Sequence, residues 1–389
     1  MNIIILSSVT YNSIHSGRTK AIVEELLKKN IPVTFVEPPI SIVGYFKDKA
    51  VTNIGNLLSR FFTNVTRKQK LYIISFPLIL PFGRLNLAHK INTSIMRRKL
   101  LRCLGDKITN QNTDTIFIIT NPYWYSVIEC LKGIICYDCI DDVRVFSGVS
   151  KVKLYNKWHI DLIKRANIIF VSALKIKKDI ISINPQKAKN LVYLPNAVDN
   201  KWFIQRAKNS EIPEELKKIP KPIIGFVGLI WWWIDMELIY DVATKLHNCS
   251  FVFVGPVSQK VRKLNNIYFL GPKPYNEIPV YINSFDICIA PFKINDIGHA
   301  VDPLKVYEYL ALGKPVIASA IEELRKLDNL IYIAKNDTDF VNCVEKALKE
   351  KKEDLVIKRQ KYAELNSWES RIDTMLQTIA EYLESKKLQ

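Results

Sequence analysis

A short run of residues starting at Asp302 combines a possible helix start with a cation. Asp302 can cap a helix, and Pro303 suits the first helical position because a proline lacks the N–H that stays unpaired there. Backbone N–H groups near Leu304 and Lys305 would then point out of the helix end. Together with the positive end of the helix dipole and the lysine ammonium, they would attract a diphosphate.

Glu308 adds a carboxylate one helical turn beyond Lys305, near the same face. Its two oxygens can accept hydrogen bonds from two neighbouring hydroxyls, as on a ribose. The segment could therefore hold a nucleotide diphosphate at both ends. The alternative is an amphipathic helix that packs on a sheet, ends at Gly313 and leads through Pro315 into a buried strand.

The complete run, DPLKVYEYLALGKPVIAS, resembles the donor-sugar motif of GT-B glycosyltransferases, within the large retaining family that uses nucleotide sugars. It is most similar to the bacterial branch of teichuronic-acid glycosyltransferases. Other segments resemble this family in the same order along the chain: SGRTKAIVEELLKKNIPVTFVEPP, YDCIDD, LPNAVDNKWF, IIGFVGLIWWWIDMELI, LGPKPYNEIPVYINSFDICIAPF and NSWESRI. The resemblance implies an α/β fold of two Rossmann-like domains that face each other across a cleft, the first binding an acceptor and the second a nucleotide-sugar donor.

The domain organisation follows from this resemblance and from one change in composition. We expect an acceptor-binding domain over residues 1–200, a donor-binding domain over 201–365, and a C-terminal helix over 366–389 that returns to the first domain. Asn196 and Asp199 match the family at the crossing, where Ala197 replaces the usual glycine. The charged, proline-bearing stretch 207–222 reads as a linker.

Short apolar runs alternate with amphipathic stretches along the whole chain, which is the pattern of an α/β fold. The runs predict buried strands at Asn2–Leu6, Val33–Val36, Leu71–Ile74, Thr115–Ile119, Ile134–Tyr137, Ile168–Val171, Leu191–Tyr193, Ile223–Val227, Phe251–Val254, Ile267–Leu270, Ile287–Ala290, Val316–Ala318 and Leu330–Ile333.

Several loops that follow these strands carry candidate donor-binding residues. Gly17 permits close backbone approach at a helix start, where Arg18 presents a planar fork of donors, and the resemblance implies that both meet donor phosphate or acceptor. Gly228 ends a strand and lets a nucleotide approach the backbone. Without the resemblance, Gly17 and Arg18 would be an ordinary helix entry.

Aromatic and basic residues in two later loops extend this set. Family members often carry a basic residue after Gly228, whereas this chain has three tryptophans, of which Trp231 is our candidate for a ligand contact; the alternative is that they pack between domains. Lys273 and Tyr275 stand where the resemblance implies recognition of the base. The alternative there is a plain turn.

The catalytic residues match the family pattern less completely than the donor-binding residues do. The family usually has two carboxylates eight residues apart, and here Glu308 matches the second while Ala300 stands at the first. His299 and Asp302 are the nearest polar residues that could replace the missing acid.

A second catalytic signature of the family, a His-Asp pair at a strand end, reads Asp141-Asp142 here. An aspartate at this place could hydrogen-bond a sugar hydroxyl or, with a raised pKa, assist proton transfer. We therefore predict Asp141, Asp142 and Lys305 as catalytic residues. The structural alternative is that two aspartates after a strand cap the next turn.

The net charge of the 389 residues is +18, and more than half of it lies in one segment, residues 45–107. Residues 45–107 hold thirteen Lys or Arg against two Asp, and apolar residues recur there at helical spacing, as in Leu87, Ile91 and Ile95. Such a basic amphipathic surface suits an anionic membrane leaflet. The competing partner is nucleic acid, against which the lack of any helix-turn-helix, zinc or RNA-binding signature argues, and the remaining alternative is a solvated face.

Hydropathy and cysteine content indicate where in the cell the protein is found. No apolar run reaches the length of a spanning helix, and Met1–Val9 reads as a buried strand rather than a signal peptide. Seven cysteines without regular spacing do not describe a disulfide framework. We expect a cytoplasmic protein, peripheral on the inner face of the cell membrane, with no metal and no cofactor apart from its nucleotide-sugar substrate.

These observations predict an enzyme that transfers a sugar from a nucleotide diphosphate to a saccharide or lipid-linked acceptor, in cell-surface polysaccharide or glycolipid synthesis. The resemblance implies retention of the anomeric configuration. One alternative is a nucleotide-sugar 2-epimerase of the same fold, which needs no acceptor. Another is a catalytically silent scaffold that binds donor or membrane, which Ala300 suggests.

Overall fold

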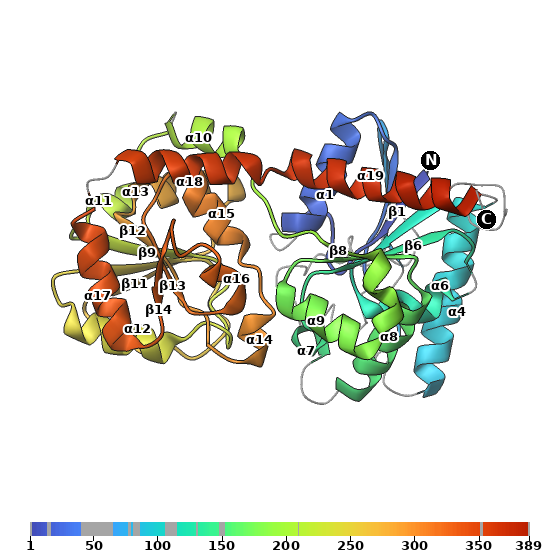
Figure 1. The fold of residues 1–389 in the computed structure, drawn as a ribbon, viewed down its shortest axis with the longest axis horizontal. Coiled ribbons are helices and arrows are strands. Elements are labelled where there is room, and N and C mark those ends of the chain that lie inside the picture. The colour runs from blue at the N-terminus through green and yellow to red at the C-terminus, as the bar shows by residue number, and fades with distance from the viewer. Residues whose placement is uncertain are drawn as a thin grey trace, which may run out of the picture. The chain divides into compact units, whose positions relative to one another are not determined.

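The computed structural model describes residues 2–13, 17–39, 65–76, 79–80, 86–105, 115–129, 131–147, 152–208, 210–350 and 353–387. The chain forms two compact units (Figure 1). The first comprises Met1–Ser172, Ile176–Leu194 and Ile379–Gln389, and the second comprises Ala173–Lys175 and Pro195–Thr378. Of the predicted basic segment, residues 45–64, 77–78, 81–85 and 106–107 lie outside the described residues.

The first unit is built on an eight-stranded sheet in the order β3-β4-β2-β1-β5-β6-β7-β8. Neighbouring strands are parallel except for β3 and β4. The strands are β1 (Asn2–Leu6), β2 (Val33–Val36), β3 (Val65–Lys68), β4 (Leu71–Ile74), β5 (Thr115–Ile119), β6 (Ile134–Cys139), β7 (Ile168–Val171) and β8 (Leu191–Tyr193).

Helices connect these parallel strands, because a connection between parallel neighbours must cross from one end of the sheet to the other. They are α1 (Gly17–Lys28), α4 (Asn86–Leu104), η2 (Pro122–Trp124), α6 (Tyr125–Ile128), α7 (Val143–Ser147), α8 (Val152–Arg165), α9 (Leu174–Ile183) and η4 (Pro185–Asn190). The central strands β5, β6 and β7 are buried along their whole length, because helices cover both faces of the sheet. Their near-continuous apolar sequences have the same cause.

The edge strand β3 was not predicted, and its sequence shows why. All four of its residues are exposed, and two of them, Arg67 and Lys68, are cationic. Charged residues on an edge strand prevent it from pairing with another chain, and they also remove the apolar signal on which strand prediction depends.

The second unit holds a parallel six-stranded sheet in the order β11-β10-β9-β12-β13-β14. Its strands are β9 (Ile223–Val227), β10 (Ser250–Val254), β11 (Ile267–Gly271), β12 (Ile287–Ala290), β13 (Val316–Ser319) and β14 (Tyr332–Ala334). Its helices are α10 (Asn200–Lys208), α11 (Glu214–Lys217), α12 (Met236–Lys245), η5 (Tyr275–Glu277), α13 (Ile278–Ser284), α14 (Asp296–His299), α15 (Leu304–Ala311), α16 (Glu322–Arg325), α17 (Asp337–Leu348) and α18 (Glu353–Leu365).

Alternate residues of the strands in this unit feed two separate cores. In β10, Val252 and Val254 join the core that contains α10, α13, α15 and α18, while Phe251 and Phe253 join the core under α12 and α17. The period of two in a strand sends successive side chains to opposite faces, so the sheet is covered on both sides. This is a doubly wound, Rossmann-like layer arrangement.

Two further details concern the predicted strands and the last helix. All thirteen predicted strands are present, but β14 begins at Tyr332 rather than Leu330, because Leu330 and Ile331 lie in the preceding turn and pack in the core. The final helix α19 (Trp368–Lys387), red in Figure 1, contributes residues up to Thr378 to the second unit and residues from Ile379 to the first. No helix in the described part of the chain is long and apolar enough to span a membrane.

Candidate active site

The start of α15 differs from the prediction in one respect. The helix begins at Leu304 with Pro303 as its N-cap residue, and Asp302 does not cap it. The Asp302 carboxylate instead accepts hydrogen bonds from the backbone N–H of Asn196, at 2.5 Å, and from the Tyr307 hydroxyl, at 3.1 Å. The prediction that Asp302 caps the helix and Pro303 occupies its first position was therefore wrong, because Pro303 is the N-cap residue and the Asp302 carboxylate bonds to Asn196 and Tyr307 instead.

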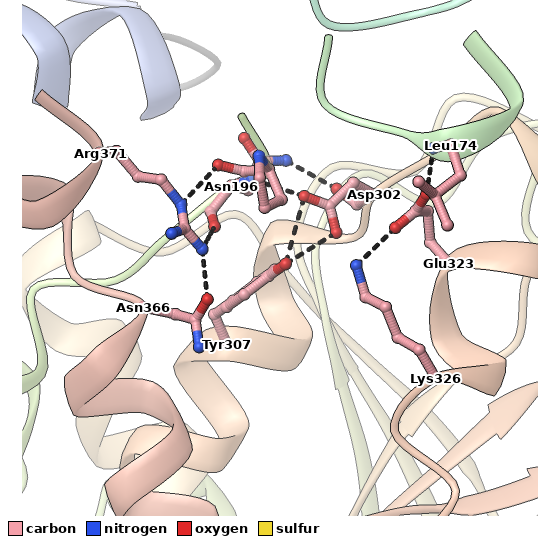
Figure 2. Close-up of polar contacts among 9 residues, drawn as sticks. Leu174, Asn196, Asp302, Tyr307, Glu323, Lys326, Asn366 and Arg371 are labelled. Atoms are coloured by element: carbon pink, nitrogen blue, oxygen red, sulfur yellow. Dashed lines mark hydrogen bonds and ion pairs between the residues drawn. The ribbon is translucent and has the colours of Figure 1, made fainter. Parts of the chain in front are cut away.

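Asp302 belongs to a buried polar network (Figure 2). The Asn196 side chain donates to the Asp302 backbone carbonyl at 2.7 Å. The Arg371 guanidinium of α19 donates to the carbonyls of Pro195 and Asn196 and to the side chain of Asn366. Burial raises the pKa of Asp302 to about 6. The network fixes the chain at residues 195–196 to the start of α15 and to α19.

A second tie in Figure 2 involves Glu323 of α16. Its buried carboxylate accepts the backbone N–H of Leu174, the first residue of α9, and pairs with Lys326 at 2.6 Å. A carboxylate at a helix start satisfies one of the free N–H groups there. This bond holds residues 173–175 to the second unit.

Glu308 and Lys305 lie on one face of α15, as their spacing predicts. The Lys305 Nζ lies 2.7 Å from the Glu308 Oε2, and the Tyr275 hydroxyl donates to Oε1 at 3.3 Å. The Lys305 ammonium also lies 5.6 Å from the centre of the Tyr275 ring. Glu308 is only 1% exposed, whereas Lys305 is 25% and Tyr275 53% exposed. The buried carboxylate is thus covered by two side chains that a ligand can reach.

Tyr275 is part of an aromatic pair that sequence reasoning missed. Its ring stacks on Trp202 of α10, with centroids 5.3 Å apart and planes inclined by 6°. Trp202 stands in the LPNAVDNKWF segment, and its backbone N–H donates to the side chain of Asp199, the residue before α10. An aromatic residue directly after the domain crossing was the signal that could have identified it. The stack fixes the orientation of the Tyr275 ring.

Lys273 lies near this pair, but its ammonium is engaged elsewhere. It forms an ion pair with Glu215 at 2.6 Å and lies 5.5 Å from the centre of the Tyr281 ring. The hydrogen bond to Glu215 raises the pKa of Lys273. Its predicted role at the base stays a prediction, and the structure gives it a packing role that the sequence did not reveal.

The loop after β9 places Gly228 and the tryptophans together. Gly228 has a φ of +152°, and an added Cβ would lie 3.0 Å from the Phe226 ring, so a side chain is disfavoured there. Trp231 and Trp233 pack edge to face, with centroids 4.8 Å apart, and both are partly exposed. Their contacts with one another stiffen the loop and leave part of the Trp231 surface accessible.

The position eight residues before Glu308 is the buried Ala300, which follows α14. Next to it, the His299 Nδ1 accepts the backbone N–H of Glu322 at 3.1 Å. A neutral imidazole with Nδ1 as acceptor carries its proton on Nε2 and can donate it from there. Since Asp302 is committed to its network, His299 is the better candidate to replace the missing acid.

In the first unit, Asp141 and Asp142 follow β6. Asp142 accepts the backbone N–H of Arg144 at 2.8 Å and forms an ion pair with its guanidinium at 2.6 Å, so it shapes the start of α7. Burial raises the pKa of Asp141 to about 6, with Asp142 adding to this effect and Arg18 opposing it. Asp142 thus performs the turn-forming role that was the structural alternative, and Asp141 has the electrostatics expected of a group that exchanges protons.

Gly17 and Arg18 open α1, where Gly17 is exposed and Arg18 is buried. The Arg18 guanidinium makes two hydrogen bonds with Asp138 of β6, at 2.8 and 3.0 Å, and a third with the carbonyl of Leu194. Asp138 interrupts an otherwise apolar strand, and that lone acid was the signal for a buried cation partner. Arg18 ties α1 to the sheet, and its predicted role toward donor or acceptor stays a prediction.

Comparison with known proteins connects this arrangement to a family. Residues 221–350 match the family model described as "Glycosyl transferases group 1", and this range contains β9 to α17 with Glu308, Lys305 and Tyr275. This match lies in the second unit, where the sequence motifs that resemble glycosyltransferases are found.

One curated relative also resembles the chain. Over 234 residues the chain is 27% identical to TuaH of Bacillus subtilis (strain 168), a protein assigned by name to teichuronic acid biosynthesis as a glycosyltransferase. That match covers 55% of this chain and 58% of TuaH, so it spans little more than half of either protein.

Solved structures extend the comparison to the whole fold. An alpha,alpha-trehalose-phosphate synthase (UDP-forming) from Burkholderia vietnamiensis superposes with a TM-score of 0.71 at 10% identity, covering 98% of each chain. HepE from Anabaena, solved with UDP and glucose, superposes with a TM-score of 0.64 at 13% identity, covering 99% of this chain and all of HepE. These likenesses confirm the predicted α/β fold of the GT-B glycosyltransferases.

Proposed function

We propose that the protein is a nucleotide-sugar-dependent glycosyltransferase that moves a sugar to a saccharide or lipid-linked acceptor with retention of configuration. In this proposal residues 1–200 bind the acceptor, residues 201–365 bind the donor, and the helix over 366–389 returns to the first domain. The relative TuaH is named for teichuronic acid biosynthesis, which supports a role in cell-surface polysaccharide or glycolipid synthesis.

One observation carries the proposal: the buried Glu308 carboxylate covered by Lys305 and Tyr275. The Glu308 Oε1 accepts a hydrogen bond from the Tyr275 phenol, whereas Oε2 is buried and ion-paired with the Lys305 ammonium but accepts no hydrogen bond from the described part of the chain. Two ribose hydroxyls can replace these partners at little cost, because one hydrogen bond is given up and two are gained. The same exchange releases the Lys305 ammonium for a diphosphate at the start of α15. Ribose and diphosphate binding are thereby coupled.

In the reaction, the diphosphate gains negative charge as the sugar bond breaks. Lys305 and the backbone N–H groups at the start of α15 stabilise that charge, which is electrostatic catalysis. The acceptor hydroxyl attacks the sugar on the face from which the diphosphate leaves. It gives its proton to the departing phosphate. His299 and Asp141 hydrogen-bond sugar hydroxyls, and Asp141 can also take up a proton because its pKa is raised to about 6.

The remaining donor contacts follow from the aromatic residues. The Tyr275 ring, fixed by Trp202, stacks beside the base, and Trp231 covers the sugar. Gly17 and Gly228 allow close backbone approach. The base is uracil in this proposal, because the solved neighbours with a nucleotide in their description name UDP.

The location follows from charge. We propose a cytoplasmic protein that binds peripherally to the inner face of the membrane, where a lipid-linked acceptor would be held. The concentration of positive charge between residues 45 and 107 supports this, since anionic lipid attracts such a segment.

The test uses the full chain, UDP sugars and extracted lipid-linked saccharides. A thermal-shift screen first selects the donor, since a ligand at 100 times its dissociation constant stabilises the fold by about 2.7 kcal/mol. We then expect UDP release that depends on acceptor, together with a product of the same anomeric configuration by NMR. Release of an altered free sugar without acceptor would instead identify an epimerase, and stabilisation by no nucleotide would overturn the proposal.

A further inference from the structure

Helix α4 in the first unit carries an unusual set of side chains. Its nineteen residues include five cations and no acidic residue. One cation, Arg97, is already engaged, since its guanidinium forms an ion pair with Glu129 at 3.0 Å and donates to the carbonyl of Ser126. On the opposite side, Met96 and Leu100 are fully buried against the unit. The inner face is therefore defined, and the question is what the outer face does.

The outer face alternates apolar and cationic residues. At 100° per residue, three apolar and three cationic side chains fall within an arc of about 120°. They are Leu87, Lys90, Ile91, Arg98, Leu101 and Arg102, all of them exposed. Leu87 is 72% exposed, so most of its apolar surface is in contact with water and does not stabilise the fold by burial.

A neighbouring segment is bonded to another side of α4. The backbone of Leu80 exchanges two hydrogen bonds with the Asn92 side chain, at 2.9 and 3.1 Å, and the Leu80 side chain is itself exposed. The two bonds hold another exposed leucine against α4. Asn92 lies about 140° from Leu87 around α4, so Leu80 is held outside the arc of the outer face.

Helix α8 of the same unit provides a comparison. Its exposed lysines Lys153, Lys157 and Lys164 share one face, within an arc of about 40°. None of the exposed large apolar side chains in the described part of the chain belongs to α8. A cationic face that merely solvates the protein looks like α8, and α4 differs from it by its exposed leucines and isoleucine.

We propose that the outer face of α4 is the surface by which the protein docks on an anionic lipid bilayer. Leu87, Ile91 and Leu101 enter the boundary between headgroups and acyl chains, and the three cations contact lipid phosphates. Nucleic acid would use the cations but would leave the apolar side chains in water, so charge and apolar pattern together favour lipid. This assignment deepens the membrane location in the proposed function and rests on that part of it.

The experiment compares three variants of the full chain with equal numbers of substitutions. The first, Lys90→Gln with Arg98→Gln and Arg102→Gln, removes the outer cations of α4. The second changes Leu87, Ile91 and Leu101 to Gln and keeps the charge. The third, the matched control, changes Lys153, Lys157 and Lys164 of α8 to Gln and removes the same charge from the same unit. Glutamine preserves helix propensity in all three.

Binding is measured by co-sedimentation with vesicles of phosphatidylcholine alone or mixed in equal parts with phosphatidylglycerol. Wild type should sediment with the anionic vesicles, and added salt should weaken the binding. The cation variant should lose roughly 100-fold in affinity and the apolar variant at least roughly tenfold, whereas the α8 control should lose less than about threefold. Nucleotide binding, measured by calorimetry, should be the same in all four proteins.

Three outcomes would overturn the proposal. They are no binding of wild type to anionic vesicles at low salt, equal losses in the α4 cation variant and the α8 control, and tighter binding of a duplex or single-stranded oligonucleotide than of the vesicles. Because nucleotide binding is measured separately, a failure of lipid docking leaves the proposed glycosyl transfer standing, and a failure of nucleotide binding leaves the docking result interpretable.

Discussion

Each unit contains an ion pair with a buried carboxylate. In the first unit Arg18 pairs with Asp138, and in the second Lys305 pairs with Glu308. The Asp138 and Glu308 side chains are 0% and 1% exposed. Their cations differ: Arg18 is 5% exposed and also bonded to a backbone carbonyl, whereas Lys305 is 25% exposed. A closed pair of the first kind holds elements together, while an open pair of the second kind can exchange its cation for a ligand.

The guanidinium and the ammonium suit these two tasks. The planar fork of Arg18 matches the two Asp138 oxygens. Exchanging Arg18 for a ligand would leave a buried charge without its partner, which is strongly unfavourable. The Lys305 ammonium sits on a flexible stem and can turn from a carboxylate to a phosphate without losing its charge. Accessibility of the cation therefore separates the structural pair from the functional one, and the following predictions test this difference.

The largest expected effect is on stability in the first unit. Arg18→Met leaves the Asp138 carboxylate buried without its partner, so the free energy of unfolding should fall by about 3–5 kcal/mol. The matched control is Lys20→Met on the same helix, whose exposed pair with Glu24 is 3.9 Å long and should be worth about 0.5 kcal/mol or less. Urea denaturation measures both. Normal stability of the Arg18 variant with a loss of ligand affinity would mean that Arg18 is a ligand contact after all.

The next effect is on catalysis in the second unit. Lys305→Ala should lower kcat by roughly 10²–10³ and donor affinity by much less, because the charge on the diphosphate grows toward the transition state. Stability should change little, as the lysine is partly exposed. Steady-state kinetics and calorimetry with the same donor give the two numbers. Equal, few-fold losses in both would make Lys305 a uniform binder rather than a catalytic residue.

A pH dependence should follow from the Asp302 network. Its folded-state pKa of about 6 lies above the unfolded value of 3.8, so the folded protein binds this proton more tightly. The free energy of unfolding should therefore fall as the pH rises from about 4 to about 6, by up to roughly 3 kcal/mol from this group. Asp302→Asn should remove that part of the slope. Identical slopes in wild type and variant, measured by denaturation at several pH values, would show that burial does not control this carboxyl.

The smallest effect concerns Tyr275. Tyr275→Phe removes one hydrogen bond to Glu308 and keeps the ring on Trp202, so UDP affinity should change by about 1 kcal/mol or less. Tyr275→Ala also removes the ring and should cost an additional 1–3 kcal/mol, roughly the worth of an aromatic stack on a base. Equal affinities of the two variants for UDP would remove the ring from base recognition.

The sequence predicted the elements of this fold better than it predicted the partners of the side chains. Runs such as Ile223–Val227 identify strands because local apolar pattern and burial have one cause. The partners of Arg18 and Asp302 could not be identified in that way, since Asp138 lies 120 residues from the first and Asn196 lies 106 residues from the second. Asp302 had a good local role as a helix cap, and a long-range contact displaced it.

Within the candidate site, the spacing of Lys305 and Glu308 was predictable because both residues lie on one helix. Trp202 was not, since its stack on Tyr275 joins residues from separate elements, α10 and η5. The edge strand β3 was not predicted for a different reason: all its residues are exposed, so its sequence lacks an apolar pattern.

The central claim, that Glu308 is a nucleotide-binding carboxylate under an exchangeable cover, is tested most directly by calorimetry of UDP binding to wild type and Glu308→Gln. The account predicts a loss of about 1.5–3 kcal/mol in binding free energy, because a charged acceptor for the ribose hydroxyls is replaced by a neutral one. The melting temperature should remain that of wild type. Unchanged affinity for UDP, or a fall in stability without a selective loss of binding, would contradict the account and make Glu308 a structural residue of α15.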